Sequence, residues 1–206
     1  SPLFGISDVG QAKVAIAEES LRESLPVRAF HGRYDEYIEQ HGRTPGHVDL
    51  LLPLANEYGV RATIENNYPP LQVYGTTASD WGINYHRHIP LHEDCSLCRF
   101  PLDAVEIPMA CSGAQVKTTG GQQVDAALPF LSVAAAALTV ADLLKLHLPG
   151  YPFSPNFTFV DFKGNLEFIN AHNKRRRQKC ICVGRSRSVY ERTIDSTAFS
   201  GLSIGP

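Results

Sequence analysis

Apolar positions along the first eighty residues predict alternating helices and strands. Residues 8–24 carry apolar side chains at helical spacing, and Ser7 or Asp8 is placed to cap the start of that helix. A second helical pattern covers residues 56–67. Between the two, the continuous apolar run at 47–55 is typical of a strand buried on both faces, as in parallel sheets. The alternation predicts an α/β fold with a mainly parallel sheet.

Further strands are predicted along the rest of the chain. The runs at 157–162 and 165–171 are separated by a tight turn around Gly164, which is typical of an antiparallel hairpin. The sheet is therefore expected to be mixed, with flanking helices. The remaining predicted strands cover residues 27–30, 69–77 and 81–90.

A long helix is predicted over residues 122–148, and its apolar stretch is long enough to span a bilayer. However, Asp125, Asp142 and Lys145 lie inside it, together with Pro129, and much of its apolar content is alanine. These residues disfavour a membrane span. We interpret the segment as a buried helix of a soluble domain.

The composition fits one ordinary globular domain over residues 1–206. The chain is 43% hydrophobic and 19% charged, and its formal net charge of −2 gives no bulk electrostatic attraction for nucleic acid or membranes. No secretory leader is visible at the start of the sequence, and the chain contains five cysteines. This combination favours a reducing compartment, the cytoplasm, where thiols stay free.

Four of the cysteines form two close pairs. Cys95 and Cys98 have C-x-x-C spacing, and Cys180 and Cys182 have the tighter C-x-C spacing. Two such pairs present four sulfurs to one tetrahedral ion, the usual arrangement of a structural zinc site. The sequence therefore predicts that these four cysteines bind zinc.

Other interpretations of this region remain open. A mixed site could use His86, His88 or His92 as ligands, or the cysteines could be ordinary buried thiols. The basic run at 173–179 could offset the roughly two net negative charges of a zinc ion with four thiolates. The same run could instead be a solvated face or, less in keeping with the net charge, contact nucleic acid.

The fifth cysteine, Cys111, lies in a segment at 91–121 that has no regular period. It precedes the long predicted helix, and a thiol near a helix N-terminus has a lowered pKa because the dipole favours the thiolate. That is how a nucleophilic cysteine is prepared, although an unpaired cysteine is also often a packing residue.

Taken in order, these segments resemble the ThiF/MoeB/E1 family, which adenylates the C-terminus of a ubiquitin-like or sulfur-carrier protein. The resemblance begins with DVGQAK at 8–13 and VDLLLPLANEYGVR at 48–61. The later segments then follow in the family's order. They are CSLC at 95–98, the loop cysteine Cys111, the small-residue helix at 122–148, the strand pair at 157–171 and the second cysteine pair. The resemblance implies a Rossmann-like adenylation domain with a crossover loop at 91–121 and a zinc-binding, polar tail at 173–206.

The resemblance also implies roles for individual residues. Lys13 matches the lysine that contacts the nucleotide, and Cys111 matches the crossover-loop cysteine that receives the activated protein as a thioester. Asn56 stands where the family has an acidic residue near ATP and Mg²⁺, so it brings no charge to the metal. The implied partners are a ubiquitin-like or sulfur-carrier protein, an E2-like protein, and a second copy or another chain.

The sequence departs from the family pattern in one large respect. No G-x-G-x-x-G follows a predicted strand, so the Gly-rich phosphate loop is absent. We therefore expect the chain to correspond to the C-terminal portion of such an enzyme, with a bacterial ubiquitin-like conjugation system as one context, and to bind ATP poorly alone. The alternatives are a thiamine- or molybdopterin-type sulfur-carrier adenylyltransferase and a zinc-stabilised, non-catalytic scaffold.

Overall fold

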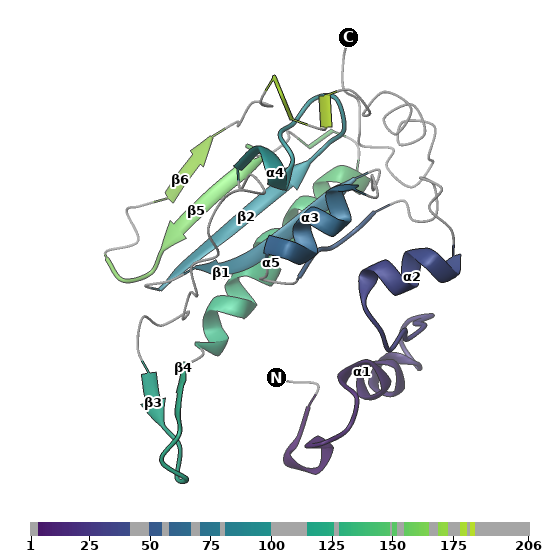
Figure 1. The fold of residues 1–206 in the computed structure, drawn as a ribbon. Coiled ribbons are helices and arrows are strands. Elements are labelled where there is room, and N and C mark those ends of the chain that lie inside the picture. Colours follow the sequence, from purple (N-terminus) through teal and green to yellow (C-terminus); the bar gives the residue numbers. More distant parts are fainter. Residues whose placement is uncertain are drawn as a thin grey trace. The chain divides into compact units, whose positions relative to one another are not determined.

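The protein is described by a computed structural model, and its chain separates into two compact units, Ser1–Arg43 and Thr44–Pro206. A single domain over residues 1–206 was expected from the sequence. Each unit is described by itself (Figure 1). The residues described are 4–41, 50–54, 58–66, 71–78, 81–99, 115–125, 128–148, 150–151, 155–164, 169–172, 178–180 and 182–183.

The first unit contains a 3-10 turn, η1 (Ile6–Asp8), and the helices α1 (Lys13–Leu21) and α2 (Tyr34–His41). The predicted helix over 8–24 is therefore too long at both ends. Gly10 has a φ of 92°, which turns the chain between η1 and α1. The Asp8 carboxylate accepts a hydrogen bond from Gly5 N at 2.7 Å, so it closes η1 and does not cap α1.

The predicted strand at 27–30 is wrong, because these residues belong to no strand. The Phe30 ring instead packs edge-on against Tyr37 of α2, with ring centroids 5.3 Å apart, and Tyr37 stacks on His41 at 4.3 Å. These ring contacts give the apolar Phe30 side chain packing partners within the first unit. Ile38 of α2 is the buried apolar residue of the described part of this unit. An apolar run can thus pack against a neighbouring helix without a sheet.

The second unit is built on a sheet of four strands in the order β1-β2-β5-β6 (Figure 1). The strands are β1 (Gln72–Ala78), β2 (Gly82–His88), β5 (Phe157–Asp161) and β6 (Ile169–His172). These positions confirm the strands predicted at 69–77 and 81–90, and the antiparallel pairing of β5 with β6 confirms the predicted hairpin.

The mainly parallel sheet predicted from the sequence is not seen in the described part of the chain, where the three strand pairs of the four-stranded sheet are all antiparallel. Only three residues, 79–81, separate β1 from β2 along the chain, which is too few for the crossover that parallel pairing requires. One parallel bridge joins Leu51 to Gln72, with Leu51 N donating to Leu71 O at 2.9 Å. The apolar run at 47–55 therefore lies parallel to β1 where it is described. The mixed α/β class holds.

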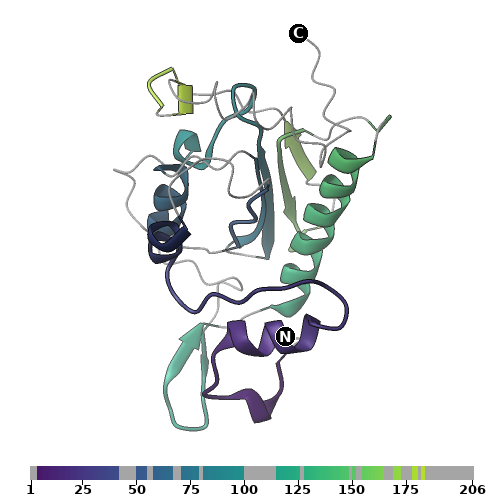
Figure 2. The ribbon, with the colours of Figure 1, turned by 90° about the vertical axis from the view of Figure 1, so that its right-hand side faces the viewer.

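Helix α5 (Pro129–His147) covers one face of the sheet, as Figure 2 shows. Its buried residues recur every three or four positions, as expected for one stripe of a helix against a sheet. They are Leu131, Ala135, Thr139, Asp142 and Leu146. By length and composition alone α5 is apolar enough to cross a membrane.

The start of α5 differs from the helix predicted over 122–148. Proline lacks an N–H and suits the first turn, and the helix begins at Pro129. Residues 123–125 instead form β4 (Gln123–Asp125), which pairs with β3 (Gln115–Lys117) in a separate hairpin. Gly121, with a φ of 81°, lies in the turn that closes it.

Helix α5 approaches β1 very closely at Gly75. A Cβ atom at this position would lie 2.7 Å from Ala135 O and 2.8 Å from Thr139 Oγ1. The helix backbone can reach the strand only because residue 75 has no side chain.

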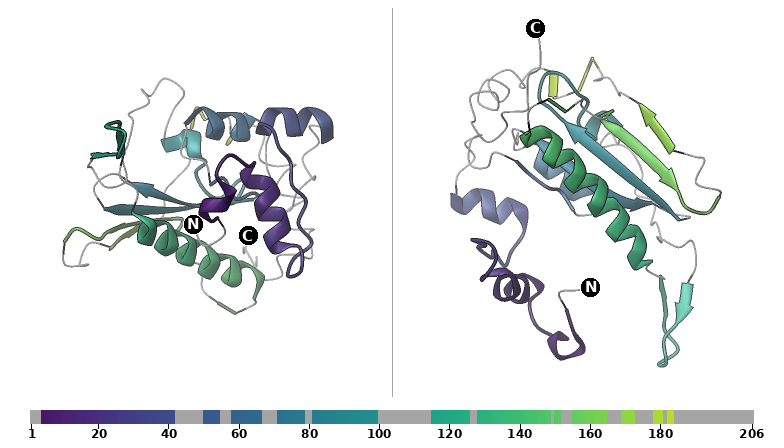
Figure 3. Two further views of the ribbon diagram at one scale, coloured as in Figure 1. Left: turned by 90° about the horizontal axis from the view of Figure 1, so that it is seen from below. Right: turned by 180° about the vertical axis from the view of Figure 1, so that it is seen from behind.

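The opposite face of the sheet carries α3 (Tyr58–Asn66) and the short helix α4 (Ser96–Arg99), as Figure 3 shows from below and behind. The helix predicted at 56–67 is thereby confirmed. Successive residues of a strand point to opposite faces. Tyr85 and Arg87 of β2 accordingly meet Asp142 of α5, whereas His86 meets Asp94 on the other side.

Candidate metal centre

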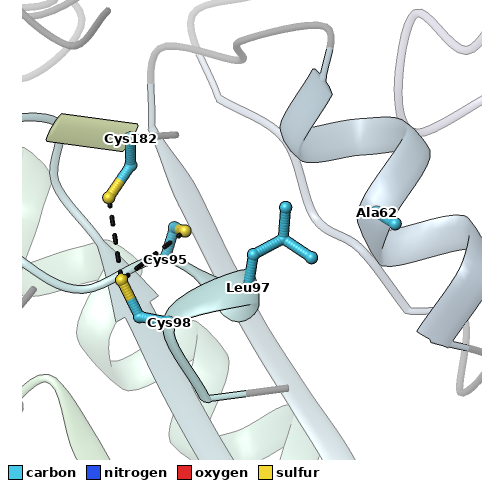
Figure 4. Close-up of a cluster of buried hydrophobic side chains, with 5 residues drawn as sticks. All are labelled: Ala62, Cys95, Leu97, Cys98 and Cys182. Atoms are coloured by element: carbon cyan, nitrogen blue, oxygen red, sulfur yellow. Dashed lines mark hydrogen bonds between the residues drawn. The ribbon is translucent and has the colours of Figure 1, made fainter. Parts of the chain in front are cut away.

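Four cysteine sulfurs gather at the end of the sheet beside α3 and α4. Cys95 directly precedes α4 and Cys98 lies within it, whereas Cys180 and Cys182 come from the C-terminal region. All four sulfurs lie within 4.8 Å of one another. The Sγ atoms of Cys95 and Cys180 are 3.4 Å apart, and Figure 4 shows Cys98 pointing toward both Cys95, at 3.9 Å, and Cys182, at 3.7 Å.

These separations fit a zinc ion. With Zn–S bonds of about 2.3 Å, a tetrahedral site places its sulfurs about 3.8 Å apart. The three measured separations are 3.4, 3.7 and 3.9 Å. In the described part of the chain, this is the one group of three or more potential metal-binding side chains whose ligand atoms converge. The four cysteines could therefore hold a zinc ion, which would tie the loop before α4 to the C-terminal region.

The backbone turns in the same way at both pairs. Cys98 N donates to Cys95 O at 3.0 Å, and Val183 N donates to Cys180 O at 3.0 Å. Each i→i+3 bond closes a tight turn that brings two sulfurs to one side of the chain. The C-x-C pair, although one residue shorter, thus forms a turn matching that of the C-x-x-C pair.

Four neighbouring thiols cannot all ionise without a compensating cation. Hydrogen bonds with Cys182 and Cys98, together with burial, raise the pKa of the Cys95 thiol far above its usual range. A divalent cation reverses this preference because it stabilises the thiolates directly, so its uptake would release protons.

The sulfurs are mostly shielded from solvent by apolar neighbours. Ala62 of α3 and Leu97 of α4 pack in the same cluster as Cys95, Cys98 and Cys182 (Figure 4). Cys95 has no exposed surface, whereas Cys180 is half-buried at the edge of the cluster. In the predicted basic run, Lys179 is the one basic residue that the structure describes, and it is exposed; residues 173–177 lie outside the described part.

A buried polar network fixes the loop that carries Cys95. The Asp94 carboxylate accepts hydrogen bonds from His86 Nε2 at 3.0 Å, Asn156 Nδ2 at 2.9 Å and Arg99 Nε at 3.1 Å. The other ring nitrogen of His86 pairs with the Tyr74 hydroxyl. Burial lowers the pKa of His86 to about 4, so the ring is neutral near pH 7 and can accept the Tyr74 proton at Nδ1 while it donates to Asp94.

The next acidic residue, Glu93, holds the loop to the other face of the sheet. Its carboxylate accepts from Arg87 Nε at 3.0 Å and from Ile89 N at 2.9 Å. Arg87 Nη1 also pairs with the Asp142 carboxylate of α5 at 3.1 Å, and Tyr85 donates to Asp142. Neighbouring loop residues therefore connect the cysteine cluster to α5 through buried ion pairs.

The other predicted site residues are not tested by this cluster. Lys13 is the exposed first residue of α1 in the first unit. Asn56 and Cys111 lie outside the described residues, so their roles stay predictions, as do the bounds 91–121 and 173–206. His86 uses both ring nitrogens in hydrogen bonds to Tyr74 and Asp94, which argues against it as a ligand. His88 is not among the side chains whose ligand atoms converge in the described part of the chain.

Sequence reasoning missed the residues that position the cysteines. Glu93 and Asp94 directly precede Cys95, and the alternation of β2 places His86 and His88 on one strand face. This juxtaposition is a signal of a shared polar network, although Asn156, which donates to Asp94, lies too far along the chain to be found by spacing.

Comparison with known proteins gives a fold and no family assignment. No protein-family model matches the chain, and no curated protein matches it. Two solved structures of Escherichia coli MccB are similar, one with MccA-N7isoASN (TM-score 0.56, 16% identity) and one with succinimide (TM-score 0.54, 15% identity). Each match covers 89% of this chain but only 54% and 53% of the MccB chains, so the chain spans about half their length. Over the matched part, the chain thus shares the fold of MccB.

Proposed function

We propose that this chain is part of an E1-like enzyme that activates the C-terminus of a ubiquitin-like protein. In this reaction a carboxylate oxygen of the partner attacks the α-phosphorus of ATP, and pyrophosphate leaves. A thiolate then attacks the acyl adenylate to form a thioester, and AMP leaves. The fold likeness to MccB carries the proposal, and the four converging cysteines fit it.

In this proposal the metal ion has a structural role and takes no part in the reaction. A zinc ion held by Cys95, Cys98, Cys180 and Cys182 has no open coordination position, so it would stabilise the fold only. Cys111 is the proposed acceptor of the activated protein. Lys13 and Asn56 are the proposed contacts to ATP and its Mg²⁺ in the complete enzyme, which we place in the cytoplasm.

Two surfaces of the second unit support a role that includes partner proteins. A groove of about 430 Å³ lies between α5 and β1, and the apolar Leu52 and Leu54 at its rim are 40% and 69% exposed. The outer side of α5 exposes Val133, Val140 and Leu144. Contiguous exposed apolar surface is typical of protein-contact regions. We propose that the partners include a ubiquitin-like or sulfur-carrier protein, an E2-like protein, and a second copy or another chain.

A thioester assay tests this function. The complete enzyme, the candidate partner protein, ATP and Mg²⁺ should give a product that reductant cleaves and that Cys111→Ala abolishes. Cys111→Ala should leave the zinc content unchanged, which separates loss of the acceptor from loss of the fold.

Other outcomes identify the two alternatives. Adenylation that proceeds to sulfur transfer from a donor, without conjugation, would identify a sulfur-carrier adenylyltransferase. If no partner is adenylated and Cys111→Ala changes nothing, while chelation unfolds the chain, the protein is a zinc-stabilised scaffold and the E1-like proposal fails.

A further inference from the structure

Glu65 of α3 is a buried carboxylate next to the cysteine cluster, with 4% of its surface exposed. Its Oε1 atom accepts three hydrogen bonds. Ser96 donates twice, from its backbone N at 3.0 Å and from its Oγ at 2.9 Å, and Gln72 Nε2 of β1 donates at 3.1 Å. One oxygen atom therefore joins α3, β1 and the loop that carries two of the cysteines.

The place of Ser96 makes this junction important for the metal centre. Ser96 directly follows Cys95 and lies two residues before Cys98. With both its amide and its hydroxyl held by Glu65, the peptide between the two sulfurs cannot rotate without breaking two buried hydrogen bonds. Gln72 in turn holds the Glu65 carboxylate against the sheet. The direction of the Cys95 side chain is thus set by contacts outside the cluster itself.

We propose that Glu65 is a positioning residue of the metal centre, and that it acts through its acceptor oxygen. Four thiolates around one divalent ion already carry a net charge of about −2, so the further negative charge of Glu65 is electrostatically unfavourable there. The charge of Glu65 therefore does not favour metal binding. Its hydrogen bonds to Ser96 favour it instead, because they hold Cys95 and Cys98 in place before the metal binds. Partners of this kind that orient metal ligands commonly contribute about 10–100-fold to metal affinity. This inference rests on zinc binding by the four cysteines.

The test compares Glu65→Ala with Glu65→Gln in the full chain loaded with zinc. Transfer of zinc to a chromophoric chelator gives the affinity and the release rate. Glu65→Ala should weaken zinc binding about 10–100-fold and speed its release. Glu65→Gln keeps an acceptor oxygen without the charge, so it should remain within about threefold of the unmodified chain. Cobalt(II) spectra should show a disturbed tetrahedral thiolate site in Glu65→Ala and an unchanged one in Glu65→Gln.

Thr139→Ala is the matched control, since Thr139 is equally buried but donates to Ala135 O on the other face of the sheet. It should lower the unfolding midpoint without changing zinc affinity. Should Glu65→Ala fail to fold, Ser96→Ala removes the hydroxyl donor alone and should still accelerate zinc release. Unchanged release in either variant overturns the proposal, and so does a Glu65→Gln defect as large as that of Glu65→Ala. A wild-type chain that binds no zinc would instead refute the metal centre itself.

Discussion

The two faces of the sheet are held by different kinds of interaction. On the α5 face, Leu131, Ala135 and Leu146 pack against Leu71, Ile83 and their neighbours, and the one ion-paired residue of that helix stripe is Asp142. On the α3 and α4 face, thiols, carboxylates and an imidazole ring are buried together. Apolar packing depends on shape and is nearly insensitive to pH or metal. The polar face responds to pH through its buried titratable groups, and it would also respond to a metal ion bound by the four cysteines. We call the α3 and α4 side the conditional face of the sheet.

Removing a metal ligand tests the conditional face and should have the largest effect. Cys95→Ser is expected to abolish stoichiometric zinc binding and to lower the free energy of unfolding by roughly 4 kcal/mol or more, because the metal's binding energy is also folding energy. Metal analysis and denaturant titration give the two values. Unchanged zinc content would show that Cys95 is not a ligand. Adding chelator to the Cys95→Ser chain should then cause no further loss of stability.

Adding one methyl group tests the shape-dependent face. Gly75→Ala places a Cβ within 2.8 Å of Ala135 O and Thr139 Oγ1, so α5 must shift. We expect a loss of roughly 2–3 kcal/mol in unfolding free energy, typical of overpacking, with zinc affinity unchanged. Gly120→Ala is the matched control, because its Cβ would meet nothing closer than 3.8 Å. Equal stability of the two variants would contradict the close approach of α5.

Acid should act on the polar face through His86. Its pKa is lowered to about 4 by burial, whereas the unfolded chain titrates it near 6.5. Between those values the unfolded state binds the extra proton, so the unfolding free energy falls as the pH drops from about 6.5 to 4, by roughly 3 kcal/mol in all. Hydrogen bonds from His86 and Arg99 lower the pKa of Asp94 although burial opposes this, so Asp94 contributes below that window.

The pH measurement needs a chain without metal, since acid also releases zinc. Chelated, reduced wild-type protein should lose stability with a slope approaching one proton between pH 6.5 and 4.5, and His86→Gln should reduce that slope. Identical slopes in the two chains would show that His86 is not buried in its neutral form.

The local spacing of apolar residues predicted most of the described secondary structure of the second unit but little of that of the first. Strands β1, β2, β5 and helix α3 have clear periodicity, and paired cysteine spacing predicted which sulfurs meet. The spacing of apolar residues gave a wrong prediction where a single residue determined the local structure. Gly10 divides a helical run, and Phe30 finds a partner in α2 rather than in a sheet.

Long-range choices were also beyond local reasoning. Strand direction depends on how elements connect, so a buried apolar run at 47–55 did not reveal that the described strand pairs are antiparallel. The polar residues around the cysteines are specified by tertiary contacts such as Ser96 with Glu65, which are 31 residues apart. Only the three-dimensional arrangement brings such partners together.

The sulfurs of Cys95 and Cys180 belong to residues separated by 85 positions in the chain. A cross-link that closes a loop of this length removes roughly 4–5 kcal/mol of entropy from the unfolded ensemble, by the chain-entropy relation. During synthesis, the first cysteine pair leaves the ribosome long before the second exists. A metal ion held by all four cysteines would therefore be captured late in folding, after Cys180 and Cys182 have been synthesised.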